Sequence, residues 1–180
     1  MAETAKHTLI ALVENKPGVL NRVSSLLRRR GFNIESIAVG SSELPGLSRM
    51  TFVVKGADEM VEQARKQLAK LIDVVKVSDI TGGDIVTREL AMIKVHATSA
   101  TRSEIIQIVA IFRASIIDVG HDSVTVEVTG DEDKIDSLYN LLRSFGIKEL
   151  ARTGRLALLR GGVGTTQAEE KVSRAGKEGK

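Results

Sequence analysis

Two short polar segments carry the side chains best suited to hold a small molecule. Asn15 and Gly18 lie where an apolar run gives way to a helical pattern, and Asn33 follows the predicted end of that helix. An asparagine amide both donates and accepts hydrogen bonds, so two of them can take an ammonium group and a carboxylate together. Gly18 permits close approach because it has no Cβ. The spacing predicts that both segments lie at one edge of a small α/β unit and hold a zwitterion there.

The helix between these segments adds partial positive charge. Pro17 suits its first position, because the N–H that proline lacks would have no partner there. The N–H groups of Gly18, Val19 and Leu20 would then be free to bind a carboxylate, and the helix dipole favours one. The apolar side chains that could line a small pocket are Val19, Leu20, Ile34 and Ile37. A structural alternative remains, in which both asparagines serve only as turn or capping residues.

The elements that position these residues follow from the apolar spacing. The continuous apolar run Leu9 to Val13 predicts a central strand that is covered on both faces. A helical stripe follows and ends at Gly31, with three arginines, Arg28 to Arg30, in its last turn. The later predicted elements are a strand at 33–40, an alternating strand at 49–55, a helix at 60–71 and a strand at 74–80. The element order is βαββαβ.

The pattern then starts again after a Gly-rich linker. The predicted elements are a strand at 89–97, a helix at 103–112, strands at 115–119 and 123–128, a helix at 135–142, and short closing strands at 148–151 and 156–159. We therefore expect an α+β fold of two ferredoxin-like βαββαβ units, each with both helices on one face of an antiparallel sheet. The predicted ranges are a first domain at 7–80, a linker at 81–86, a second domain at 87–160, and a disordered tail at 161–180.

Composition narrows the class of protein. The chain has 180 residues and no Cys, which excludes disulfides and thiolate chemistry. The formal net charge of +3 comes from 26 basic and 23 acidic residues that are interspersed, so an ordinary mixed surface is favoured over a nucleic-acid stripe. No apolar run reaches the roughly 20 residues that span a bilayer, and we expect a soluble cytoplasmic protein. A single unit would leave one sheet face and one edge strand open, so we expect a homodimer.

Other polar clusters offer no catalytic or metal chemistry. The histidines His7, His96 and His121 are far apart and lack metal-ligand spacing. No serine has an evident histidine and aspartate partner. The acidic cluster that begins at Asp131 is predicted to cap a helix rather than to bind a cation. We therefore expect neither catalytic nor metal-binding residues.

The order of motifs resembles a known family. Asn-Lys-Pro-Gly-Val-Leu at 15–20 and Arg-Gly-Phe-Asn-Ile-Glu-Ser at 30–36 look like the opening of an ACT domain, specifically that of the small regulatory subunits of acetolactate synthase (acetohydroxyacid synthase). The likeness continues through 47–51, 67–74, 88–95 and 112–119 and covers about residues 7–162. The second unit is then an ACT-like C-terminal domain.

The resemblance implies a function in branched-chain amino acid biosynthesis. Such a subunit activates a catalytic large subunit and confers feedback inhibition by valine, or a related amino acid, bound at the interface of two ACT domains. The implied effector contacts are Asn15, Gly18, Val19, Leu20, Asn33 and Ile34. Thiamine diphosphate, Mg²⁺ and FAD would belong to the large subunit, and this chain would carry no cofactor.

Two other functions stay open from the residues alone. The order βαββαβ also occurs in RNA-binding modules, which stack bases on strand aromatics, and here the strands offer little beyond Phe52. A free-standing enzyme would need a convergent set of acid, base and nucleophile, and none is evident.

Overall fold

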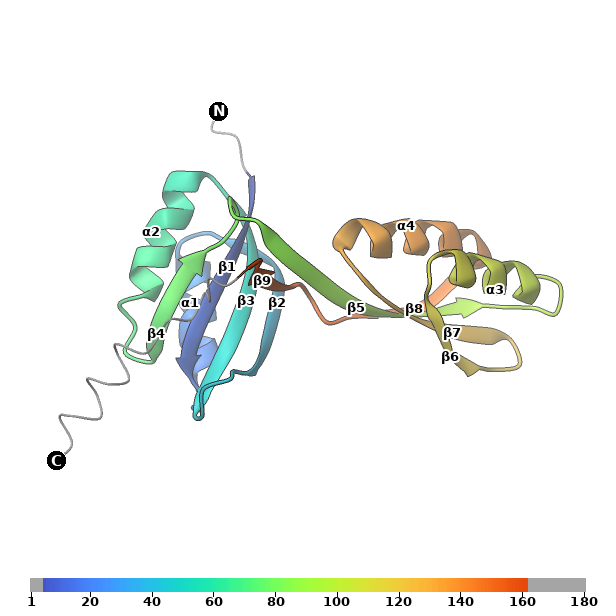
Figure 1. Ribbon diagram of the computed structural model, residues 1–180, viewed down its shortest axis with the longest axis horizontal. Helices are drawn as coiled ribbons and strands as arrows, with labels where there is room; N and C mark the ends of the chain where they lie inside the picture. Colours follow the sequence, from blue (N-terminus) through green and yellow to red (C-terminus); the bar gives the residue numbers. More distant parts are fainter. Residues whose placement is uncertain (1–4, 162–180) are drawn as a thin grey trace. The chain divides into compact units, whose positions relative to one another are not determined.

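A computed structural model of the chain describes residues 5–161, which form two compact units (Figure 1). Unit 1 comprises residues 5–86 together with 157–161, and unit 2 comprises residues 87–156. Each unit has an antiparallel sheet with helices, which confirms the predicted α+β class and its two βαββαβ units. The predicted tail lies outside the described residues from residue 162 onward.

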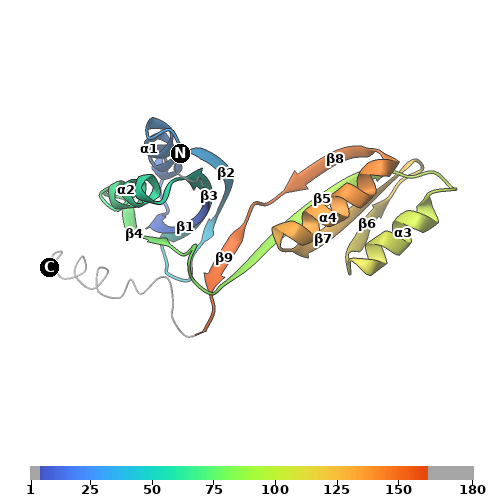
Figure 2. The same cartoon turned by 90° about the horizontal axis from the view of Figure 1, so that it is seen from above.

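Unit 1 is a four-stranded sheet with two helices. Its elements are β1 (Ala5–Glu14), α1 (Val19–Arg29), β2 (Asn33–Ser41), β3 (Leu47–Gly56), α2 (Asp58–Leu68) and β4 (Val74–Asp79). The strand order is β2-β3-β1-β4, and neighbours are antiparallel. Because β1 and β2 both run antiparallel to β3, they run parallel to each other, with β2 at the edge of the sheet (Figure 2).

The core of unit 1 explains the apolar run in β1. Leu9, Ala11 and Val13 are fully buried in the main core, which also contains apolar residues of α1 and α2. On the other sheet face, Ile10 packs with Ile80 and Ala157. The prediction that residues 9–13 are covered on both faces is confirmed.

Unit 2 repeats this topology with its own core. Its elements are β5 (Ile85–His96), α3 (Arg102–Ile111), β6 (Ser115–Val119), β7 (Ser123–Gly130), α4 (Glu132–Leu142), a 3₁₀ turn η1 (Arg143–Phe145) and β8 (Ile147–Arg152). The strand order is β6-β7-β5-β8, and β9 (Leu156–Leu159) also pairs with β5. Asp131 caps α4 by accepting a hydrogen bond from the Lys134 N–H at 2.9 Å, which confirms the predicted capping role.

Three boundaries differ from the sequence prediction. The first helix begins at Val19 rather than at Pro17, because Gly18 adopts a left-handed φ of +85° and serves as its N-cap. The last two residues of the predicted linker 81–86 already belong to β5. The segment at 156–159, which the sequence assigned to the second domain, places Ala157 in an apolar cluster with Ile10 of unit 1. This placement covers a sheet face that would otherwise expose β1.

Candidate effector site

The turn between β1 and α1, residues 15–18, is fixed by hydrogen bonds on both sides; we call it the Gly18 turn. The Asn15 N–H donates to the Gly46 carbonyl at 2.9 Å, in the turn that joins β2 to β3. The Glu14 N–H donates to the Asp73 carbonyl at 2.8 Å, in the turn that joins α2 to β4. The Gly18 turn is therefore anchored to two neighbouring turns at one end of the sheet.

An ion pair between a buried carboxylate and an exposed arginine supports the start of α1. Arg22 donates from Nε to Asp73 Oδ2 at 2.6 Å, and the Asp73 side chain is only 9% exposed. The same guanidinium lies over Gly18, since a Cβ built there would be 3.5 Å from Arg22 Nη1. The requirement for glycine at this position is thus set by its positive φ, which side chains disfavour, rather than by a steric clash.

A second ion pair lies beside the first. Lys16 Nζ is 2.7 Å from Glu14 Oε2, and this hydrogen-bonded carboxylate raises the pKa of Lys16. Each carboxylate near the Gly18 turn therefore has a cation within hydrogen-bond distance.

The first turn of α1 offers open backbone donors. The sequence predicted that the Val19 N–H is free, but this group donates a long hydrogen bond to the Lys16 carbonyl at 3.4 Å. Within residues 5–161, no acceptor is found for the N–H groups of Gly18, Leu20 and Asn21. Three donors at a helix N-terminus remain available to an anion.

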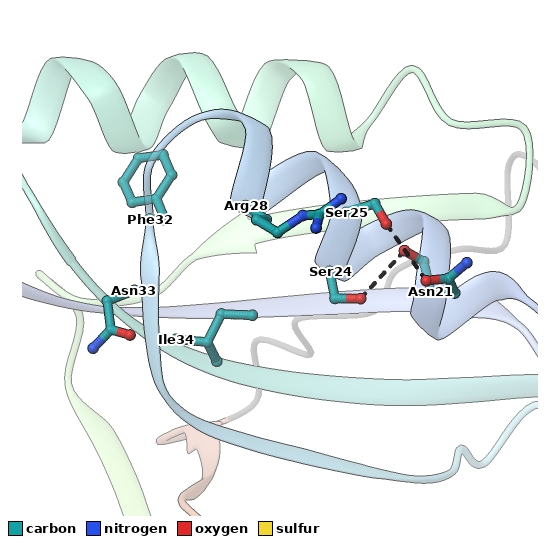
Figure 3. Close-up of a pocket in the computed structure, with 7 residues that line it drawn as sticks. All are labelled: Asn21, Ser24, Ser25, Arg28, Phe32, Asn33 and Ile34. Atoms are coloured by element: carbon teal, nitrogen blue, oxygen red, sulfur yellow. Dashed lines mark hydrogen bonds between the residues drawn. The ribbon is translucent and has the colours of Figure 1, made fainter.

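A hollow of about 470 Å³ lies farther along α1 (Figure 3). Its α1 wall is polar, and its other wall comes from the end of the α1–β2 connection and the first residues of β2. The lining residues are Asn21, Ser24, Ser25, Arg28, Phe32, Asn33 and Ile34. Two of the predicted site residues, Asn33 and Ile34, therefore lie in this hollow.

Asn15 and Asn33 do not meet within one chain, and the predicted single edge is wrong in this respect. Asn33 pairs with Lys55 of β3, and Lys55 in turn pairs with Lys6 of β1. Asn33 is thus level with Lys6, nine residues before Asn15. At about 3.3 Å per strand residue, the two asparagines are on the order of 30 Å apart, at opposite ends of the sheet.

The side chains of the other predicted contact residues differ in how far they are exposed. The Val19 side chain is 2% exposed and belongs to the core, so only its backbone faces the Gly18 turn. Leu20 is 46% exposed, while Ile34 is half-buried against the core. Sequence reasoning missed the pair Arg22–Asp73, because no spacing rule connects residues this far apart along the chain.

Other candidate sites are weaker in the structure. His7 is buried, with Nδ1 3.1 Å from Asp79 Oδ2 and Nε2 3.3 Å from Asp58 Oδ1. Across residues 5–161, no group of three or more histidine, cysteine or carboxylate side chains could hold a metal ion. Phe52 is fully buried in the core and so is not available to stack a base. No helix in the described part of the chain is long and apolar enough to cross a membrane.

Comparisons with known proteins agree over most of the described chain. Residues 9–76 match the family model of the AHAS small subunit-like ACT domain, and residues 88–161 match that of the small subunit of acetolactate synthase. A probable acetolactate synthase small subunit of Archaeoglobus fulgidus is 59% identical over 156 residues, covering 87% of this chain and 98% of that protein. The acetolactate synthase small subunit of Mycobacterium bovis is 51% identical over 163 residues, covering 89% of this chain and 97% of that protein.

A solved structure gives the same result for the fold. The crystal structure of an acetolactate synthase small subunit from Thermotoga maritima superimposes with a TM-score of 0.82 at 46% identity. That match covers 88% of this chain and 99% of the other.

Proposed function

The chain belongs to the acetolactate synthase small-subunit family, and we propose that it activates a catalytic large subunit and makes it sensitive to valine. The observation that carries the valine site is the separation of Asn33 from the Gly18 turn within one chain. A site that uses both segments needs a second copy of the chain. We propose that this copy is the partner in a homodimer.

The sheet topology supports such a dimer. β2 is an edge strand, so its outer backbone groups lack a strand partner within unit 1. The Gly18 turn lies at the end of the sheet where β2 finishes, because Asn15 is bonded to Gly46. If two β2 strands pair antiparallel about a two-fold axis, Asn33 of the partner subunit comes level with the Gly18 turn.

The residues that meet in this way suit a branched-chain amino acid. The open N–H groups at the start of α1 favour the carboxylate. Asn15 and Asn33 of the partner subunit can bind the ammonium group, since each has an amide oxygen that accepts. Leu20 offers an exposed apolar surface for the side chain of valine. Two such sites form per dimer by symmetry.

Regulation would follow from a shift in population. Valine that bridges two chains favours the dimer arrangement in which both walls of the site are present, and this arrangement changes the attached catalytic subunit. By reciprocity, the catalytic subunit alters the affinity for valine. We place thiamine diphosphate, Mg²⁺ and FAD on the large subunit, so that this chain supplies regulation and no catalytic group.

Calorimetric titration of the full chain with valine tests the site, with leucine and threonine as comparisons. We expect saturable binding of valine at about one per chain. Asn15→Ala and Asn33→Ala should each weaken it at least tenfold, because each removes a polar contact from both sites of the dimer. Both side chains are exposed, so neither change should disturb the fold.

Mixing the two variants distinguishes an interfacial site from a site within one chain. A heterodimer of Asn15→Ala with Asn33→Ala has one doubly altered site and one intact site, so a refolded mixture should recover tight binding at about a quarter of all sites. Recovery of none would contradict the shared site. Valine inhibition of the reconstituted enzyme that is unchanged by Asn33→Ala would also contradict it.

A further inference from the structure

We infer that the turn between α2 and β4, residues Leu71–Asp73, is the output of the effector site and that Ile72 docks it onto the catalytic subunit. This inference rests on the proposed function, because it concerns where the valine signal leaves unit 1.

Ile72 is the unusual residue of this turn. Its side chain is 93% exposed, which exceeds the exposure of every other large apolar residue in the described chain. The next highest is Ile111 of unit 2 at 77%. A fully exposed isoleucine gains the most from burial by a partner, since nearly its whole apolar surface would leave water.

Hydrogen bonds fix the backbone of the turn so that the Ile72 side chain points into solvent. The Leu71 N–H donates to the Leu68 carbonyl at 3.1 Å, and the Val74 N–H donates to the Leu71 carbonyl at 3.0 Å. Leu71 packs against the core, and Asp73 is buried. Ile72 therefore projects from a turn whose two neighbouring residues are both anchored in unit 1.

Asp73 connects this turn to the Gly18 turn by two separate bonds. Its carbonyl accepts from the Glu14 N–H at 2.8 Å, and its carboxylate accepts from Arg22 Nε at 2.6 Å. Arg22 in turn lies over Gly18. A ligand that repositions the first turn of α1 therefore acts on Asp73, and the residue next to Asp73 in the chain is Ile72.

Charge around the turn specifies the partner surface. The carboxylates of Glu14 and Asp73 are each paired with a cation, Lys16 and Arg22. These two pairs carry no net charge, so exposed Lys70, two residues before Ile72, gives the surface beside the turn its net positive charge. The complementary surface is an apolar pocket bordered by carboxylates, and we assign it to the catalytic subunit.

The test uses the full chain with the catalytic large subunit and measures two quantities for each variant. One is the apparent Kd for the large subunit, from activation as the chain is titrated in without valine. The other is the Kd for valine by calorimetry, with and without the large subunit. Ile72→Ser should weaken large-subunit binding about ten- to a hundredfold and leave the valine Kd of the free chain within twofold. Ile111→Ser, the matched exposed isoleucine in unit 2, should change neither.

The relay is tested by a different pair of variants. Arg22→Gln and Asp73→Asn should still bind the large subunit, but the ratio of valine Kd values with and without that subunit should move toward one. Arg22 is the exposed partner of the pair, so Arg22→Gln should fold normally. This variant keeps the test valid if Asp73→Asn fails to fold.

Three results would overturn the inference. Ile72→Ser could match Ile111→Ser in large-subunit binding, it could instead dissociate the homodimer, or Arg22→Gln could leave the ratio of valine Kd values unchanged. A wild-type chain that does not bind valine would overturn the proposed function instead. The Ile72 comparison would still be readable then, because it is made without valine.

Discussion

Units 1 and 2 share one topology but present different surfaces beside their edge strands. Helices α1 and α3 end in the same way: Gly31 and Arg113 both have a positive φ, and the next residues, Phe32 and Ala114, donate to the carbonyls of Leu27 and Val109. These shared bonds make the two helices comparable residue by residue.

The flank of α1 is polar throughout, whereas that of α3 alternates polar and apolar side chains. In unit 1 the hollow beside β2 is lined along α1 by Asn21, Ser24, Ser25 and Arg28. The corresponding residues of α3 are Ser103, Ile106, Gln107 and Ala110, and Ile106 is 46% exposed. The uniformly polar wall of the hollow in unit 1 therefore has no equivalent along α3, and this difference supports placing the proposed amino-acid site in unit 1. The fold sets the scaffold, and the side chains on it set the use.

Substitutions in the two separate cores are expected to have the largest effect on stability. Leu27 of α1 and Leu138 of α4 are both fully buried, each in the core of its own unit. Leu27→Ala and Leu138→Ala should each lower the free energy of unfolding of the altered unit by about 2–5 kcal/mol. Hydrogen exchange should show the loss only in the altered unit. Equal loss in both units would mean that they unfold as one, and would break the comparison.

The N-termini of α2 and α4 should differ by about 1 kcal/mol in capping. Asp131 caps α4, whereas Ala57 at the start of α2 has the extended backbone of a cap (φ −78°, ψ 146°) but no side-chain acceptor. Thermal unfolding should show Asp131→Ala losing about 1 kcal/mol and Ala57→Ser gaining up to about 1 kcal/mol. Asp131→Asn is the control that keeps an acceptor. A loss on Ala57→Ser would contradict this account.

The smallest effect concerns pH and an exposed pair on α2. Hydrogen bonds from Arg65 and Lys66 lower the pKa of Glu62 from 4.5 to about 2. A lowered pKa in the folded state means that the pair stabilises unit 1 above pH 4.5 and that this contribution is lost as pH falls toward 2. Denaturant unfolding of wild type and Glu62→Gln should therefore differ at neutral pH and converge near pH 2. Glu59→Gln on the same helix is the control, and a gap that persists at pH 2 would contradict the assignment.

Periodicity in the sequence was enough to predict the elements and their order. The run Leu9–Val13 predicted a strand buried on both faces, and Gly31 predicted the end of α1; both predictions are confirmed. The predicted start of α1 at Pro17 was wrong. Proline suits the first position of a helix, but it is equally compatible with the turn that precedes the left-handed Gly18.

The arrangement of the site was harder to predict from the sequence. Asn15 and Asn33 flank one helix, which suggested that they are neighbours. A helix that joins two parallel strands, however, carries the chain back along the sheet, so the residues at its two ends lie at opposite ends of the strands. The pair Arg22–Asp73 depends on how α1 packs beside the α2–β4 turn, and no local pattern reports that packing.

The packing of residues 157–161 against unit 1 makes that unit a discontinuous domain. Ala157 covers Ile10 and Ile80, and Arg49 donates from Nη2 to the Ala157 carbonyl at 3.0 Å. A truncation after residue 86 would delete this cover and leave an apolar sheet face in water. The properties of such a fragment would describe an effector domain with part of its core removed, and a faithful isolated domain would need the last segment rejoined to it by a designed linker.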